Sequence, residues 1–107
     1  MKAIEYIMSI SKETEAEFLK YVKEVLGPTW KKLGCQKHEI YKVTDKAIVG
    51  RQIVEQDRFI ERLYFGDDFD ISRFYSEARK KYLEVVRSYE DMFGVYQIEL
   101  RILKEVT

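Results

Sequence analysis

A few side chains in this 107-residue sequence could transfer a proton or bind an anion. His38 is the single histidine, and histidine is the side chain that titrates near neutral pH without help from its surroundings. If it faces a cavity together with Ile40, it could act as a general base. Tyr64, Arg62 or Arg101 could then steady a substrate anion. The position of His38 in a predicted strand favours the alternative, in which the histidine is hydrogen-bonded at an interface.

Four charged residues form a second candidate group. Glu5, Glu99, Arg62 and Arg101 could be an acid–base and anion-binding set, because opposed carboxylates and guanidiniums shift each other's pKa. The alternative is a set of cross-strand ion pairs that tune the register of a dimer. Both readings can hold, since such pairs can line a pocket and set a register.

Other kinds of site are not indicated. The only cysteine, Cys35, excludes an internal disulfide, and its surroundings predict a small buried residue rather than a nucleophile. One histidine and one cysteine cannot build a four-ligand zinc site within one chain. The five glycines are scattered and form no phosphate loop. We therefore expect no metal and no cofactor.

The charge balance limits the partners. Nineteen basic and 19 acidic residues give a net charge of zero, which argues against a nucleic-acid or membrane-surface binder. The sequence also has no apolar run long enough to span a bilayer and no signal-peptide pattern, so a cytoplasmic location is expected. The many Lys and Glu residues match a thermophile composition. At 12.9 kDa the chain can bury one core, which predicts a single domain over residues 1–107.

The apolar periodicity predicts the elements that position these residues. The expected order is strand, helix, three strands, helix, strand. The first helix begins after Ser11–Thr14, is interrupted at Gly27–Pro28 and ends at Gly34. The predicted strands are Lys2–Ile10, Cys35–Thr44, Lys46–Glu55, Arg58–Phe65 and Val95–Val106.

The second helix, from Asp70 or Ser72 to Gly94, has an apolar line with heptad-like spacing. This line predicts one continuous helix that lies on a sheet; a helix–helix seam is the alternative. Without the Lys46–Glu55 strand the order is that of a split βαβ repeat. We therefore predict an α+β ferredoxin-like sandwich, an antiparallel sheet with two helices on one face.

Two helices can cover only one face of this sheet. The first and last strands present an apolar row to that face, and Phe59, Leu63 and Phe65 do the same in the Arg58–Phe65 strand. The second face mixes apolar and charged residues, and such a surface usually marks an interface or a binding groove. A two-fold dimer that packs sheet on sheet would cover it.

Two segments resemble a known group of proteins. Leu33-Gly34-Cys35-Gln36-Lys37-His38-Glu39-Ile40-Tyr41 after the first helix, and Phe59-Ile60-Glu61-Arg62-Leu63-Tyr64-Phe65 before an acidic turn, resemble the dimeric α+β barrel proteins. The likeness is greatest to the antibiotic-biosynthesis-monooxygenase group. It implies a homodimer whose two sheets close into a barrel, often with a ligand cavity on each sheet.

The sequence also departs from that group. Lys46–Glu55 looks like an extra hairpin arm, and the Asn-Trp-His set of haem-degrading members is absent because the chain has no Asn. No catalytic residue is carried over. Two hypotheses remain. The first is a homodimer or higher oligomer that binds a small organic molecule, and that is an enzyme candidate of oxygenase or isomerase type. The second is a non-catalytic assembly or regulatory module whose second sheet face is only a dimer interface.

Overall fold

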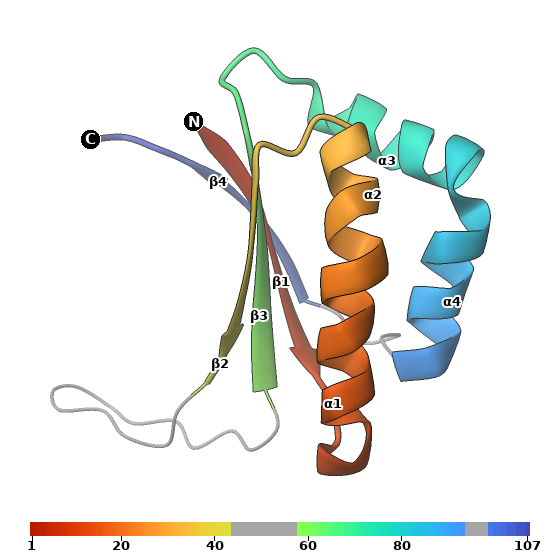
Figure 1. Ribbon diagram of the computed structural model, residues 1–107. Coiled ribbons are helices and arrows are strands. Elements are labelled where there is room, and N and C mark those ends of the chain that lie inside the picture. Colours follow the sequence, from red (N-terminus) through yellow and green to blue (C-terminus); the bar gives the residue numbers. More distant parts are fainter. Residues whose placement is uncertain (44–57, 94–98) are drawn as a thin grey trace, which may run out of the picture.

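The fold is an α+β ferredoxin-like sandwich, as predicted, with helices packed on one face of a four-stranded antiparallel sheet (Figure 1). The computed structural model describes residues 1–43, 58–93 and 99–107, with 92 and 93 by their backbone only. The strand order is β2-β3-β1-β4. The elements are β1 (Lys2–Ser9), α1 (Lys12–Tyr21), the π-helical turn η1 (Val22–Leu26), α2 (Gly27–Lys32), β2 (Lys37–Lys42), β3 (Arg58–Phe65), α3 (Ile71–Lys81), α4 (Leu83–Phe93) and β4 (Glu99–Lys104).

Some predicted features lie outside the described residues. They are the Lys46–Glu55 strand with its hairpin arm, the helix stop at Gly94 and the first residues of the last strand. Among the described helices, none is long and apolar enough to cross a membrane.

The central strand β3 shows the predicted alternation of its two faces. Phe59, Leu63 and Phe65 are buried under the helices, while Ile60, Arg62 and Tyr64 are partly exposed on the opposite face. The period of two places one further residue, Glu61, on the helix-covered side, where it is also buried. A charged side chain therefore lies in the middle of the core.

The first helix runs through the predicted interruption at Gly27–Pro28. The backbone widens into the π-helical turn Val22–Leu26, and the Gly27 N–H bonds to the Val22 carbonyl. Pro28 then occupies the first turn of α2, where its missing N–H is not needed. The predicted kink is thus absorbed by the wider turn, and α1, η1 and α2 form one continuous rod (Figure 1).

The second helix was predicted as one continuous element, and this is wrong. The Asp70 carboxylate caps α3 as expected, but the chain leaves helical geometry at Tyr82, and α4 continues in a different direction (Figure 1). Three basic residues lie in the last turn of α3 and Glu84 lies in the first turn of α4, which matches the charges that stabilise a helix end and a helix start. The heptad-like line is therefore divided between two helices.

The last strand is less covered than predicted. Leu100 and Ile102 pair with Tyr6 and Ile4 and so share the helix-facing side of the sheet. They are nevertheless 46% and 59% exposed, because the helices do not reach this edge strand. The expected apolar row is present, but at β4 the described part of the chain leaves it exposed.

Gly34 ends the first helix, as predicted, with a backbone that favours glycine. Its φ is +103°, and a Cβ there would lie 2.5 Å from the ring of Phe69, which stacks on Phe65. The turn between α2 and β2 is thereby packed directly against the loop that precedes α3.

We expect Gly34→Ala to lower the free energy of unfolding by about 1–3 kcal/mol, because the new methyl group is strained by φ and clashes with Phe69. Gly66→Ala is the matched control, since its Cβ would only touch Gln36 at 3.5 Å. Denaturant unfolding compares the two variants, and an equal loss of stability in both would contradict this account.

Candidate functional site

Three of the predicted site residues meet on the second face of the sheet. Glu5 lies on β1 between Arg62 of β3 and Arg101 of β4, and the strand register places each arginine directly opposite it. Arg62 Nε lies 2.8 Å from Glu5 Oε2, and Arg101 Nη2 lies 3.2 Å from Glu5 Oε1. Both oxygens of this carboxylate are thus occupied within one chain, as the ion-pair reading expects.

The tyrosine predicted for this site belongs to the same face. Hydrogen bonding to Glu39 raises the pKa of the Tyr64 phenol, and hydrogen bonding to Glu5 raises the pKa of Arg62. Glu39 in turn accepts a hydrogen bond from Tyr41 at 2.6 Å, which lowers the pKa of the Glu39 carboxyl. The hydrogen bonds on this face therefore stabilise the charged forms of Glu39 and Arg62.

The other two predicted residues lie elsewhere. Glu99 is exposed on β4 opposite Ile7. His38 is on the helix-covered face of β2 and does not approach the arginine cluster, so the structure does not bring the six residues together.

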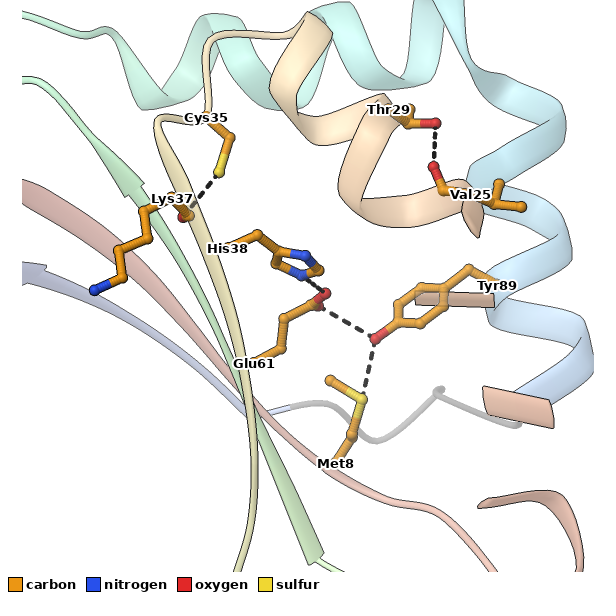
Figure 2. Close-up of polar contacts among 8 residues, drawn as sticks. All are labelled: Met8, Val25, Thr29, Cys35, Lys37, His38, Glu61 and Tyr89. Carbon is orange, nitrogen blue, oxygen red and sulfur yellow. Dashed lines mark hydrogen bonds and ion pairs between the residues drawn. The ribbon is translucent and has the colours of Figure 1, made fainter. Parts of the chain in front are cut away.

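Instead, His38 joins a buried carboxylate. Its Nε2 lies 2.6 Å from Glu61 Oε2, and the two side chains are only 8% and 1% exposed (Figure 2). In the sheet His38 is diagonal to Glu61, a position from which long side chains can meet. Because a carboxylate oxygen only accepts hydrogen bonds, the histidine donates through Nε2.

The second oxygen of Glu61 faces a tyrosine from α4. The Tyr89 hydroxyl lies 3.3 Å from Glu61 Oε1 and 3.0 Å from Met8 Sδ (Figure 2). Burial raises the pKa of Tyr89 well above its usual value, and the charge on Glu61 adds to this. Among the described residues, Oε1 is therefore held by this one long hydrogen bond.

Glu61 and Tyr89 line a cavity of about 170 Å³ between the sheet, α2 and the bend from α3 to α4. Half of its lining residues are aromatic, and an arginine from α3 and a second glutamate from α4 also line it. The lining residues are Tyr6, Trp30, Glu61, Phe74, Tyr75, Ala78, Arg79, Val86, Tyr89 and Glu90.

The cavity wall also holds a donor. The indole N–H of buried Trp30 has no hydrogen-bond partner among the described residues. Unpaired buried donors are rare because they lose their hydrogen bond to water. Tyr6 and Tyr75 bond to each other at 3.4 Å across the same cavity, and burial raises the pKa of both.

Sequence reasoning missed Glu61 and Tyr89 as site residues, although one signal was present. In β3 the inward positions are Phe59, Glu61, Leu63 and Phe65, and a glutamate in that row has no place in an ordinary core. Cys35 was predicted as a small buried residue, and this is confirmed; its thiol donates to the Lys37 carbonyl (Figure 2).

The fold defines a class of α+β proteins that known structures share. The chain is similar to HapK from Hahella chejuensis, with a TM-score of 0.67 and 13% identity over 99% of this chain and 93% of that one. A protein of Deinococcus radiodurans described as an antibiotic biosynthesis monooxygenase gives a TM-score of 0.66 and 11% identity, over 100% and 94% of the two chains. A dimeric ferredoxin-like protein from an uncultured marine organism gives 0.67 and 19%, over 100% and 96%.

No protein-family model matches the sequence, and no curated protein does so either. The similarity to the solved structures confirms the resemblance to the antibiotic-biosynthesis-monooxygenase group at the level of the fold.

We expect the stability contributed by Tyr89 to disappear at alkaline pH. A phenol whose pKa is raised by folding stabilises the folded state below its unfolded value of 10.0, and the contribution is lost as pH rises above it. Tyr89→Phe should cost about 1–2 kcal/mol near pH 8 through the lost hydrogen bond. Denaturant unfolding near pH 11 should show a smaller difference between the two proteins; a constant difference would contradict this expectation.

Proposed function

We propose that this protein is a homodimer that binds a small planar organic molecule in the cavity between sheet and helices. Glu61 is the group that accepts a proton from that molecule, so the reaction is of isomerase or cofactor-independent oxygenase type. Both reaction types begin by removing a proton from the substrate, which a positioned carboxylate can do.

The observation that carries this proposal is the 1% exposed Glu61 carboxylate at the wall of an aromatic cavity. Burying a charged group costs several kcal/mol unless its partners compensate, and cores rarely contain one without a functional reason. Here one oxygen is bonded to His38 at 2.6 Å, while the long contact to Tyr89 is the only one that the described residues make to the other oxygen. That second oxygen is available to a ligand.

The size and polarity of the cavity define the ligand. A cavity of about 150 Å³ in another protein accepts benzene, so about 170 Å³ suits a molecule slightly larger than one ring. An acceptor such as a carbonyl would satisfy the Trp30 N–H, and a hydroxyl or an acidic C–H would face Glu61. Similarity in fold to a protein described as an antibiotic biosynthesis monooxygenase supports a small organic ligand.

A model reaction tests Glu61 without knowledge of the natural substrate. 5-Nitrobenzisoxazole is planar and loses its ring C–H proton to a base. The N–O bond then breaks and the isoxazole ring opens. The carbon and nitrogen become a nitrile, and the oxygen, which stays on the benzene ring, becomes the phenolate of a coloured nitrophenolate product. We expect the protein to accelerate this elimination. Glu61→Gln should lower the rate roughly 10²-fold, because general-base catalysis is lost.

Glu17→Gln, an exposed carboxylate on α1, is the matched control and should leave the rate unchanged. Binding is followed separately by the fluorescence of Trp30, the only tryptophan, which lines the cavity. No binding would overturn the cavity as the ligand site. Binding without Glu61-dependent elimination would support the non-catalytic module and overturn the proton transfer.

The exposed apolar residues of β4 support the homodimer. Leu100 and Ile102 are exposed on one side of this strand and Leu103 on the other, and among the described strands β4 is an edge of the sheet. An exposed apolar edge strand readily pairs with another chain. A second copy would cover β4 and the second face, where the Glu5–Arg62–Arg101 cluster would set the register.

We expect light scattering at micromolar concentration to give twice the 12.9 kDa chain mass. Ile102→Glu should give monomers, because it places a charge in the apolar contact. Leu19→Glu on α1 is the control: Leu19 is 41% exposed and lies away from β4, so this variant should remain dimeric. A monomeric parent protein would contradict the proposal.

A further inference from the structure

We infer that the indole N–H of Trp30 binds an oxygen atom of the ligand, and that this contact decides which ligands the cavity accepts. The inference rests on the proposed function of Glu61 and assigns a second polar contact in the same site. The class of ligand follows from the two contacts together. It is a molecule whose oxygen acceptor is conjugated with the bond from which Glu61 takes the proton.

The polar side chains that line the cavity are paired with each other, and Trp30 is the exception. The other polar lining residues form the pairs Tyr6–Tyr75, Tyr89–Glu61 and Arg79–Glu90. The Nε1 atom of Trp30 has no hydrogen-bond partner in the described part of the chain. A donor in a cavity wall that lacks a protein acceptor can take its acceptor from the molecule that occupies the cavity.

Burial makes the missing acceptor of Trp30 significant. The residue is only 6% exposed, so its indole N–H has given up most of its contact with water. A buried donor without an acceptor costs stability, because folding removes its hydrogen bond to water and supplies no other. A ligand oxygen in the cavity would restore that hydrogen bond.

The indole of Trp30 is held in place without a ligand. Its ring packs edge-on against the ring of Phe74, with the centroids 5.5 Å apart and an interplanar angle of 62°. Its backbone carbonyl accepts hydrogen bonds from the N–H groups of Leu33 at 3.1 Å and Cys35 at 3.0 Å, where α2 ends. The donor is therefore positioned in advance, and binding need not order it.

The size of the cavity brings Trp30 and Glu61 to the same ligand. Trp30 belongs to α2 in the helical layer and Glu61 to β3 in the sheet, and both line this one space of about 170 Å³. A cavity of similar volume in another protein is filled by one benzene molecule. A single small molecule between the two layers would therefore contact the indole and the carboxylate together.

The hydrogen bond from Trp30 would strengthen during the proton transfer. When Glu61 takes the proton from a C–H bond, the electron pair of that bond moves into the conjugated system and the oxygen gains negative charge. Returning the proton to another carbon of the same system completes an isomerisation, with no oxidant required. Hydrogen bonds to charged acceptors are stronger than those to neutral ones. The N–H of Trp30 thus stabilises the transition state more than the bound ligand.

NMR of the single indole N–H tests this contact directly. Trp30 is the only tryptophan, so its Nε1–H signal needs no assignment. We expect 2-indanone, a planar ketone, to move this proton signal downfield, whereas indane, which has the same rings without the oxygen, should not. Binding of each compound is followed independently on its own signals. Bound 2-indanone with no downfield shift, or the same shift with indane, would overturn the inference and leave the cavity as the ligand site. If neither compound binds, the cavity itself is contradicted.

Exchange of the hydrogens beside the carbonyl of 2-indanone for deuterium tests the effect on the reaction. Trp30→Phe should lower kcat roughly 10²-fold with a smaller change in KM, because a donor to the developing oxyanion is lost. Glu61→Gln should lose the exchange but keep the indole shift. An unchanged kcat in Trp30→Phe would overturn the role of Trp30 in the reaction, whereas exchange that persists in Glu61→Gln would contradict only the proposed base.

A matched variant separates the lost donor from the lost volume. Trp30→Phe should weaken the binding of 2-indanone relative to indane by roughly three- to tenfold, because only the ketone accepts the hydrogen bond. Val86→Ala also enlarges the cavity but removes no polar group, so it should weaken both compounds alike. The same change in relative affinity in both variants would show that the indole acts through its volume, and would overturn the inference.

Discussion

The carboxylate of Glu61, buried in the middle of the sheet, is the constraint to which the neighbouring structure responds. A glutamate at this depth needs hydrogen-bond donors, because burying its charge without partners costs several kcal/mol. β2 supplies His38 and α4 supplies Tyr89, and both contacts require these elements to pack closely on β3. The polar contacts thus join strands and helices that are otherwise held by apolar packing.

The helices around this group are shaped by local features with different causes. The π-helical turn admits Pro28 and places Gly27 against His38, so the rod passes beside the imidazole without displacing it. The bend at Tyr82 turns α4 relative to α3 (Figure 1). Residues of both helices and of the sheet line the aromatic cavity. A straight helix would follow one direction over the sheet, and the cavity walls would not be formed by two helices that diverge.

The two faces of the sheet divide the charged residues by role. On the second face Glu5 is paired with two arginines directly opposite it, so these charges are satisfied across neighbouring strands. On the helix-covered face the charge of Glu61 meets a histidine and a tyrosine beside a cavity. Ion pairs on an open face suit contact with a second copy, whereas a carboxylate in an aromatic cavity suits a ligand.

The sequence by itself determined the span of β3, the helix-covered face of Phe59, Leu63 and Phe65, the stop at Gly34 and a helix start at Asp70 or Ser72, because these follow from local periodicity and backbone preference. It also contained six candidate site residues, of which three meet in one cluster. Only the tertiary structure decided that His38 belongs with Glu61 and Tyr89, which are 23 and 51 positions away. Strand register and helix packing bring such distant residues together, and no local pattern encodes that register. The bend at Tyr82 likewise appears only in the tertiary structure, because the heptad-like line of the sequence continues through it.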